Sequence, residues 1–277
     1  MSIKEIKNGI FSVGVLNPAL RVFDIIMKTQ YGTSYNAYYI EDEHPTLVET
    51  VHETFWPQYY ENLCAACDPA KIEYIIFNHT EPDHSGSLRR LLDLNPEITV
   101  VGSAAALKNI NQIINKPFKS LVAKDGDTLN IGSRTLTFIS APNLHWPDTM
   151  FTYIASDKLA FTCDFLGAHY CEPSMMDTSV TYPDKYAGEF LNYYISIFSP
   201  FKKFVLAGLD KLDKLDVDTV CTSHGPILTE SIQDAKDMYR LWSTPVQKTG
   251  KTAVIAFVSA YGYTRKLALF AEEYLMQ

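Results

Sequence analysis

The sequence has little basic charge and no long apolar run. Its 277 residues include 24 Lys and Arg against 32 Asp and Glu, which gives a formal net charge of -8. A protein that neutralises nucleic-acid phosphates needs a basic face, so we expect no nucleic-acid partner. No stretch approaches the roughly eighteen apolar residues of a transmembrane helix, so we expect no membrane span.

The beginning of the chain also lacks the features of a secretory signal. Lys4, Glu5 and Lys7 interrupt the short apolar residues of the first ten positions, so there is neither a basic region nor an unbroken apolar core. Cysteine is scarce, and its number, five, is odd. An odd number in a chain of this size argues against a disulfide framework and for a reducing compartment. We therefore expect a cytoplasmic protein.

Cys64 and Cys67 form a C-x-x-C pair. Such a pair can be a redox dithiol, but this one follows a helix-like segment, residues 53–63. A spacing of three in a helix places two residues on one face without any further role. We favour a structural role for the pair.

Short β-rich runs alternate with helix-like segments. Runs rich in Val, Ile, Tyr, Phe or Thr, bounded by turn residues, predict strands at 9–15, 34–40, 46–49, 72–78, 99–102 and 134–140. Helical spacing predicts helices at 53–63, 86–94, 104–114, 186–198 and 229–242. Several of these strands follow one another through hairpin turns, which does not suit a simple doubly wound sheet. The order predicts a layered α/β protein whose sheets are covered by helices.

The pattern breaks at residues 244–251, where Thr244-Pro245 and Thr249-Gly250 predict a linker between residues 1–243 and residues 252–277. After it come an apolar run at 253–258 that predicts a strand, a loop at 259–264 and an amphipathic helix to Gln277. We expect this segment to be the opening β-loop-α unit of a nucleotide- or flavin-binding fold, too short to form such a domain by itself.

Four potential metal ligands lie in six residues at His79-Thr80-Glu81-Pro82-Asp83-His84, directly after the apolar run 72–78. An extended start would put His79, Glu81 and Asp83 on one side, while His84 follows as the chain turns after Pro82. Burying several imidazoles and carboxylates around one point raises the free energy of the fold unless a cation compensates their charge. The segment therefore predicts a metal site.

Three further candidates, His145, Asp164 and His224, stand where other strand-like segments end. With the first cluster they make four histidines and three carboxylates. One metal with an open position cannot use seven such ligands, whereas two metals that share a carboxylate can. The sequence predicts a two-metal centre, and Asp164 is the natural bridge because each of its oxygens can reach one ion.

These residues resemble the metallo-β-lactamase superfamily and, within it, the flavodiiron proteins, also called A-type flavoproteins. The resemblance covers the whole chain and includes residues 36–40, 79–87, the motif His145-Trp146-Pro147-Asp148-Thr149 and the segment after Lys251. Hydrolases of the superfamily usually have histidine where this chain has Glu81, and they bind zinc. A carboxylate makes the site harder and favours iron. The resemblance implies a metallo-β-lactamase-like αββα sandwich followed by the first β-loop-α of a flavodoxin-like domain.

The resemblance also implies roles for individual residues. One iron would be bound by His79, Glu81 and His145, and the other by Asp83, His84 and His224, with Asp164 bridging. Tyr193 matches a tyrosine that lines the substrate pocket of relatives, although packing in the core is an alternative. Asp24 stands roughly where some relatives have a pocket histidine. The loop that cradles the FMN phosphate in the family is matched by Ser259, Tyr261, Gly262, Tyr263 and Thr264, with an ordinary strand-turn-helix as the alternative.

The function implied is a diiron oxidoreductase that reduces O2 to water, NO to N2O, or both, with electrons delivered through FMN. The resemblance further implies an electron donor such as rubredoxin or a flavin reductase, and a head-to-tail homodimer. Two other readings remain open. One is a dizinc hydrolase of an ester, thioester or lactam. The other is a stable scaffold without activity, or part of a larger chain whose FMN domain is missing.

Overall fold

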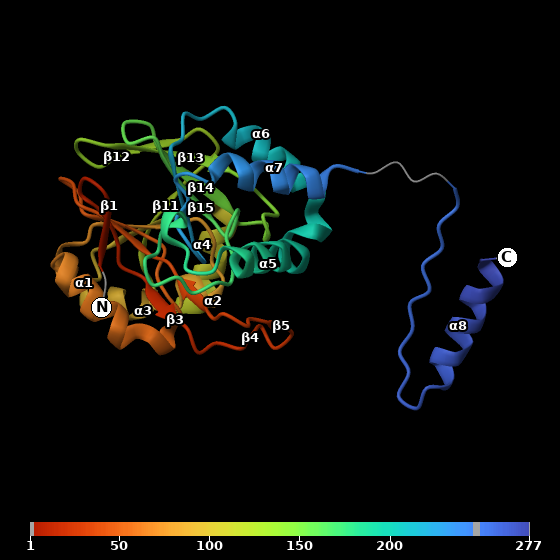
Figure 1. The fold of residues 1–277 in the computed structure, drawn as a ribbon. Helices are drawn as coiled ribbons and strands as arrows, with labels where there is room; N and C mark the ends of the chain where they lie inside the picture. The colour runs from red at the N-terminus through yellow and green to blue at the C-terminus, as the bar shows by residue number, and fades with distance from the viewer. Residues whose placement is uncertain (1–2, 246–249, 277) are drawn as a thin grey trace. The chain divides into compact units, whose positions relative to one another are not determined.

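The computed structural model describes residues 3–245 and 250–276, and it divides the chain into two compact units, Met1–Thr244 and Pro245–Gln277 (Figure 1). The division falls within the predicted linker, of which residues 246–249 lie outside the described residues. No helix of the described residues is both long and apolar enough to cross a membrane.

Unit 1 contains two large sheets. In spatial order, the seven-stranded sheet consists of β1 (Lys4–Lys7), β2 (Ile10–Ser12), β7 (Tyr38–Ile40), β8 (Thr46–Val48), β9 (Tyr74–Phe77), β10 (Thr99–Gly102) and β11 (Lys119–Val122). The five-stranded sheet consists of β12 (Thr128–Asn130), β13 (Thr135–Ser140), β14 (Met150–Ile154), β15 (Leu159–Cys163) and β16 (Thr219–Thr222). Strands β8 to β11 run parallel, as do β15 and β16, and the remaining neighbours are antiparallel. Two small ribbons pair β3 (Val15–Asn17) with β6 (Thr33–Tyr35) and β4 (Val22–Phe23) with β5 (Met27–Lys28).

The α-helices of unit 1 flank the two sheets. They are α1 (Trp56–Ala66), α2 (Pro82–Ser85), α3 (Leu88–Leu94), α4 (Ala104–Ile114), α5 (Pro183–Tyr193), α6 (Lys202–Leu212) and α7 (Ile232–Ser243). Single 3-10 turns lie at Glu53–Phe55, Pro69–Lys71, Asp177–Ser179 and Ser199–Phe201, and a π turn, Tyr194–Phe198, continues α5.

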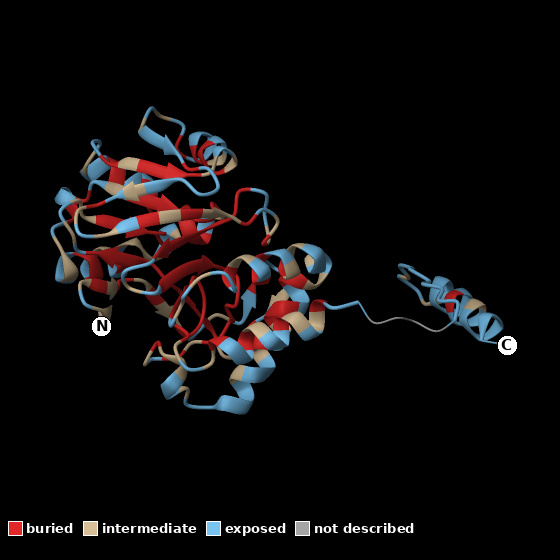
Figure 2. Cartoon of the chain, turned by 90° about the horizontal axis from the view of Figure 1, so that it is seen from above, coloured by how far each residue is buried: buried red, intermediate tan, exposed pale blue. Residues whose placement is uncertain are grey.

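Successive side chains of a strand pack against different neighbouring layers, and this arrangement builds the sandwich. In β9, Ile75 and Phe77 pack with helices α1, α3 and α4, whereas Ile76 between them packs against the five-stranded sheet. In β14, Phe151 and Tyr153 face α5, α6 and α7, and the flanking Met150 and Ile154 face the seven-stranded sheet. Because successive strand residues point to opposite faces, each sheet buries both faces. Figure 2 shows buried residues concentrated in the strands, with exposed residues on the outer faces of the helices. The predicted αββα sandwich is confirmed.

Helix α4 shows how local sequence sets an element. The Ser103 side chain accepts a hydrogen bond from the backbone N–H of Ala106 and so caps the first turn. Buried residues at helical spacing, from Ala106 to Ile114, form the face against the sheet. The helix ends at Asn115, whose φ of 51° is left-handed, a conformation that asparagine tolerates.

Two predicted strands are each divided between different sheets. The run 9–15 becomes β2 and β3, and the run 34–40 becomes β6 and β7. At the second break, the backbone N–H of Asn36 donates to Ser223 O at 2.9 Å, and its side-chain amide donates to Thr222 O and Gly225 O. Asn36 therefore pairs with the loop after β16 instead of continuing a strand.

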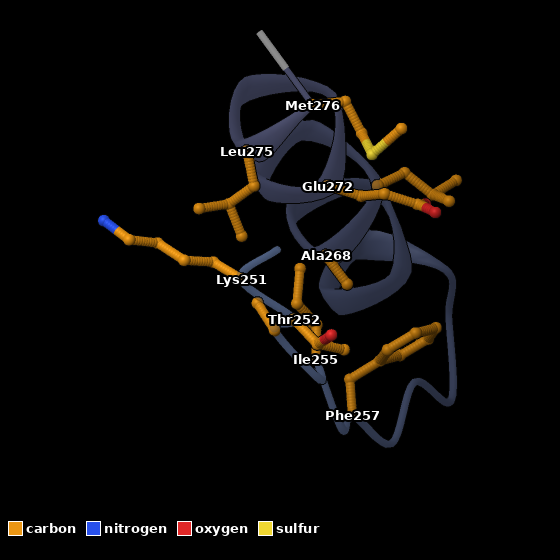
Figure 3. A pocket seen from close by; sticks show the side chains of 10 residues that line it. Lys251, Thr252, Ile255, Phe257, Ala268, Glu272, Leu275 and Met276 are labelled. Carbon is orange, nitrogen blue, oxygen red and sulfur yellow. The ribbon is translucent and has the colours of Figure 1, made fainter. Parts of the chain in front are cut away.

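In unit 2 the prediction of a strand at 253–258 is wrong, because residues 251–259 have no regular secondary structure. A strand needs a neighbour for its backbone hydrogen bonds, and the described residues of this unit provide none. Helix α8 (Tyr263–Leu275) follows Gly262, whose φ is 85°. An apolar groove between this segment and α8 is lined by Ile255, Phe257, Ala268 and Leu275 among others (Figure 3).

Candidate metal centre

The predicted ligands converge at one edge of the sandwich, where both sheets end. His79 to His84 follow β9, and His145 lies in the connection between β13 and β14. Asp164 follows β15 directly, and His224 follows β16 after one residue. The sequence predicted Asp83 in an extended segment, but Asp83 lies in α2, which begins at Pro82. Proline favours the first position of a helix because its φ is already helical and its missing N–H is not needed there.

Two sets of side chains can each hold a metal ion. In the first set, Nε2 of His79 and Nε2 of His145 lie 3.2 and 3.3 Å from Oε2 of Glu81. In the second set, Asp83 lies between two imidazoles: its Oδ1 is 3.4 Å from Nε2 of His84 and its Oδ2 is 3.1 Å from Nε2 of His224. The seven predicted candidates therefore come together, and six of them form two groups of three.

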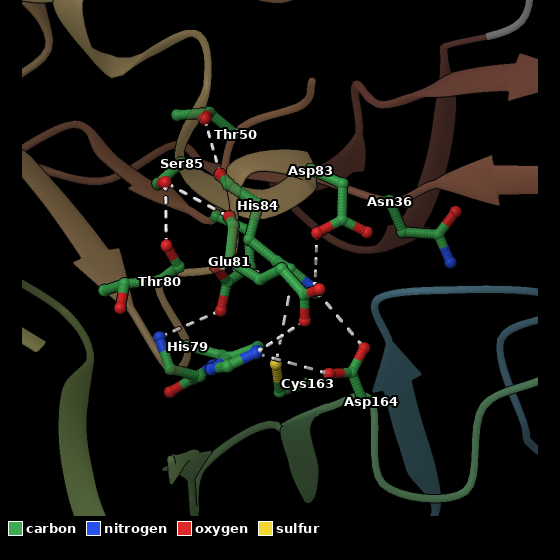
Figure 4. A network of polar contacts seen from close by, with 12 residues as sticks. Asn36, Thr50, His79, Thr80, Glu81, Asp83, His84, Ser85, Cys163 and Asp164 are labelled. Carbon is green, nitrogen blue, oxygen red and sulfur yellow. Dashed lines mark hydrogen bonds and ion pairs between the residues drawn. The ribbon is translucent and has the colours of Figure 1, made fainter. Parts of the chain in front are cut away.

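Asp164 lies between the two sets, as Figure 4 shows for its contacts with His79 and His84. Its Oδ2 is 3.9 Å from Nε2 of His79 and 3.5 Å from Nε2 of His145. Its Oδ1 is 3.3 Å from Nε2 of His84 and 3.4 Å from Nε2 of His224. Each oxygen of this carboxylate therefore faces one set, which is the arrangement that a bridging ligand needs.

The buried oxygens of these carboxylates lack ordinary partners. Within the part of the chain that the structure describes, both oxygens of Asp83, both oxygens of Asp164 and Nε2 of His84 are buried without a hydrogen bond. No Lys or Arg in the described residues forms an ion pair with Glu81, Asp83 or Asp164. Burying three carboxylates without a Lys or Arg partner is costly, and a bound cation would compensate their charge. The donor set therefore fits a pair of divalent metal ions.

The imidazoles and carboxylates of the cluster shift one another's pKa. Burial disfavours the charged form of His79, but hydrogen bonds with Asp148 and Glu81 outweigh it and raise the pKa of His79 to about 10. Burial also opposes ionisation of Asp164, yet the nearby His84 and His224 hold its pKa well below the usual range. Metal ions displace such protons from their ligands, so metal affinity at this site should rise with pH.

Sequence reasoning missed His169, which lies beside the second set. It is buried, and its ring centroid is 5.0 Å from that of His224. Its Nδ1 is 2.9 Å from Thr33 Oγ1, and its Nε2 has no hydrogen-bond partner. Burial and the neighbouring His224 hold the pKa of His169 well below its ordinary value. The only signal in the sequence was its position, five residues after Asp164.

Tyr193 and Asp24 border the same site from different elements. Tyr193 ends α5; its ring centroid lies 4.8 Å from that of His169, and its buried hydroxyl has no partner. Asp24 joins β4 to β5 and lines a cavity together with Phe23, Glu81 and Asp83. Burial and the adjacent Glu81 raise the pKa of Asp24 to about 6.

Neither cysteine of the C-x-x-C pair belongs to the groups of possible metal ligands. Cys64 is exposed at the end of α1, and Cys67 follows as its C-cap. Burial raises the pKa of Cys67 to about 12, the opposite of what a reactive thiol needs. The predicted FMN loop lies in unit 2 and leads into α8, and its role in binding phosphate stays a prediction.

Comparisons with known proteins agree with the fold and the ligand pattern. Residues 33–225 match the family model described as ODP family beta lactamase. The chain is 53% identical over 268 residues to the flavo-diiron protein FprA2 of Clostridium acetobutylicum, and the match covers 95% of this chain and 67% of that protein. It is 40% identical over 248 residues to diflavin flavoprotein A 1 of Synechocystis sp., covering 89% of this chain and 43% of the relative.

Among solved structures, rubredoxin oxygen:oxidoreductase from Desulfovibrio gigas superposes with a TM-score of 0.84 at 27% identity. That match covers 87% of this chain and 61% of the other. The chain thus spans about two thirds or less of the length of these relatives. The family match and the identity to FprA2 over nearly the whole chain show that this chain belongs to the flavodiiron proteins, with their metallo-β-lactamase-like core.

Proposed function

We propose that this chain carries the diiron centre of an oxidoreductase that reduces O2 to water, NO to N2O, or both, with electrons that arrive through FMN. The observation that carries the proposal is the position of Asp164, whose two oxygens each face one set of three ligands. Two relatives support it by name: FprA2 is a flavo-diiron protein, and the Desulfovibrio gigas enzyme is a rubredoxin oxygen:oxidoreductase.

The ligand chemistry supports iron at both positions. His79, Glu81 and His145 would hold one ion, and Asp83, His84 and His224 the other, with Asp164 between them. Three carboxylates make the site harder and more anionic than an all-imidazole set, which favours iron and its ferric state. Two ferrous ions at these positions would supply two electrons and Lewis acidity.

The surrounding side chains determine access and hydrogen bonding. The cavity beside Glu81 and Asp83 has a volume of 340 Å³, and Leu20, Val22 and Phe23 give it an apolar wall suited to a diatomic gas. Tyr193, whose ring centroid lies 6.2 Å from that of His224, presents a buried hydroxyl without a hydrogen-bond partner among the described residues. We assign Tyr193 the catalytic role of donating a hydrogen bond to the bound diatomic.

Family membership supports the remaining parts of the proposal. FMN would be bound by a flavodoxin-like domain, with Ser259, Tyr261, Gly262, Tyr263 and Thr264 at its phosphate. A donor such as rubredoxin or a flavin reductase would reduce the flavin. A head-to-tail homodimer would bring the flavin of one subunit to the metal centre of the other, and the protein would act in the cytoplasm.

Anaerobic reconstitution with Fe²⁺ tests this function. We expect two irons per chain, and consumption of O2 or NO when a reduced flavodoxin-type donor is supplied. Asp164→Asn should lose bound iron and this activity, whereas Asp218→Asn, at an exposed carboxylate that pairs with Lys7, should keep both. Two zincs per chain with hydrolysis of an ester would instead establish a dizinc hydrolase. Two irons without gas consumption would show an inactive scaffold.

A further inference from the structure

A buried carboxylate, Asp148, holds the imidazole of His79 from the side opposite its proposed metal ligand atom. Oδ1 of Asp148 lies 3.1 Å from Nδ1 of His79, and both side chains are almost completely buried. The other ring nitrogen, Nε2, faces Glu81 and Asp164. The two nitrogens of His79 thus have separate roles.

Asp148 is itself held by two neighbours, Thr80 and Ser103, and Asn109 supports Thr80. Its Oδ2 accepts a hydrogen bond from the Thr80 hydroxyl at 2.6 Å, and that hydroxyl accepts one from Nδ2 of Asn109 at 3.0 Å. The Ser103 hydroxyl donates to the backbone oxygen of Asp148 at 2.8 Å. Both carboxylate oxygens are therefore engaged, and the carboxylate has little freedom to turn away from His79.

The other three imidazoles of the centre lack such a partner. Nδ1 of His224 lies 2.7 Å from a neutral acceptor, the backbone oxygen of Ser34. Nδ1 of His84 lies 3.9 Å from Oε2 of Glu49, which is too far for a hydrogen bond to a carboxylate. It also lies 3.9 Å from Sγ of Cys163, a weak partner. His145 makes no hydrogen bond through Nδ1 in the part of the chain that the structure describes. Among the four, only His79 has a carboxylate at hydrogen-bond distance from Nδ1.

A carboxylate on Nδ1–H fixes the tautomer of a histidine and makes its other nitrogen a stronger ligand. We propose that Asp148 is a positioning residue that fixes His79 with Nε2 toward the metal and strengthens binding of the ion held by His79, Glu81 and His145. This inference rests on the ligand assignment proposed above. It predicts that the two metal positions differ in their dependence on Asp148.

Competition with a chelator for Co²⁺ measures the effect without turnover. Wild type should bind two equivalents, and Asp148→Asn should bind one of them about 10- to 100-fold more weakly while the other is unchanged. Thr80→Val, which removes the hydrogen bond to Oδ2 and the acceptor of the Asn109 amide but keeps the carboxylate, should weaken the same equivalent by a smaller factor. Asp218→Asn serves as the exposed carboxylate control and should match wild type.

Proton NMR of the Co²⁺-loaded protein adds a direct readout. The Nδ1–H of His79 should give a hyperfine-shifted resonance that exchanges slowly with solvent, and exchange should be much faster in Asp148→Asn. If Asp148→Asn binds both equivalents as wild type does, or loses both equally, the inference is wrong. A wild type that binds fewer than two equivalents, or an Asp164→Asn variant that still binds two, would overturn the ligand assignment instead. Thr80→Val keeps the Asp148 carboxylate and provides the test if Asp148→Asn does not fold. In that case, unchanged binding of both Co²⁺ equivalents by Thr80→Val would contradict the inference.

Discussion

Tyr193 places a hydroxyl in the interior, where no described residue forms a hydrogen bond with it. Such a group disfavours the fold, so Tyr193→Phe should leave stability unchanged or raise it by about 1 kcal/mol. If the hydroxyl serves the bound diatomic, the same change should lower turnover about 10-fold with iron content unchanged. Urea unfolding, metal analysis and gas consumption on one preparation check the prediction. Unchanged turnover would show that Tyr193 is only a core residue.

Asp177 connects the 3-10 turn after β15 to the start of α7. Its carboxylate accepts five hydrogen bonds: from the backbone N–H and hydroxyl of Thr229, the N–H of Glu230, and the N–H and hydroxyl of Ser231. Partial burial opposes ionisation, but the hydrogen bonds from Ser231 and Thr229 outweigh it and lower the pKa of Asp177. Asp177→Asn should therefore destabilise the protein by about 2 kcal/mol near neutral pH.

The pH dependence follows from the sign of this shift. A carboxyl whose folded-state pKa is depressed stabilises the fold above its unfolded value, 3.8, and loses that contribution as pH falls through the folded value. The difference between wild type and Asp177→Asn should therefore shrink as pH is lowered below about 4 in urea unfolding. Asp237→Asn, on the exposed face of α7, is the matched control and should have little effect. If the difference in unfolding free energy between wild type and Asp177→Asn stayed constant as the pH fell, the ionised Asp177 carboxylate would not be the source of the stabilisation.

At the residue scale, the sequence predicted the ligand candidates because their chemistry is concentrated at strand ends. The segment from His79 to His84 combines four potential metal ligands in six residues, a concentration that a surface loop without a metal does not need. His169 and Asp148 could not be assigned in this way. Their contacts with Thr33 and His79 span 136 and 69 residues, so only the folded chain brings the partners together.

At the scale of elements, the turn after β16 depends on Gly225. Its φ is +77°, and a Cβ at this position would lie 2.6 Å from the backbone oxygen of Ala168. Gly225→Ala should destabilise the protein by about 3 kcal/mol, from left-handed strain and the clash, and it should weaken metal binding through the adjacent His224.

Gly188→Ala is the matched control for this substitution. Gly188 lies in the exposed part of α5 with nothing near its missing Cβ, so alanine should stabilise the helix by about 0.5–1 kcal/mol. Thermal unfolding of both variants, with Co²⁺ titration, gives the comparison. Equal stability of Gly225→Ala and wild type would mean that the turn relaxes without cost.

Helices were predicted where apolar residues recur at helical spacing over several turns. Helix α4 has the predicted bounds, because a capping serine and a regular apolar face agree. Helix α6 was missed, although its buried residues Val205, Leu209 and Leu212 have helical spacing. Its Gly208 weakens the helical signal, and only the structure shows the reason for it: a Cβ there would lie 2.5 Å from Leu144 Cδ1.

At the scale of the molecule, unit 1 contains the whole layered core. Its three core clusters use only residues before Ser243, and the Tyr194 hydroxyl lies 2.8 Å from Oγ of Ser243 at the end of α7. A chain shortened after Thr244 should therefore unfold at nearly the same temperature as the full chain and still bind two equivalents of Co²⁺. A large drop in the unfolding temperature would show that unit 2 contributes to the stability of the core.

The order of strands and helices predicted a layered α/β protein, and the family resemblance implied the αββα sandwich, but neither predicted how the strands pair. The division of the runs 9–15 and 34–40 between sheets depends on partners that are distant in the sequence. One of them is Ser223, whose backbone oxygen accepts a hydrogen bond from the backbone N–H of Asn36. Such long-range pairing leaves no local signal.

The ligand positions also set when the centre can form during synthesis. His79 to His84 leave the ribosome with the seven-stranded sheet, whereas His145, Asp164 and His224 belong to the five-stranded sheet, which is complete only after β16. Because domains fold from the N-terminus as they are made, a nascent chain that ends before β16 lacks both His224 of the second ligand set and the last strand of this sheet. The pair of metal ions can therefore be loaded only after some four fifths of this sequence has been made, and a chain stalled earlier would expose carboxylates and imidazoles that the finished core keeps buried.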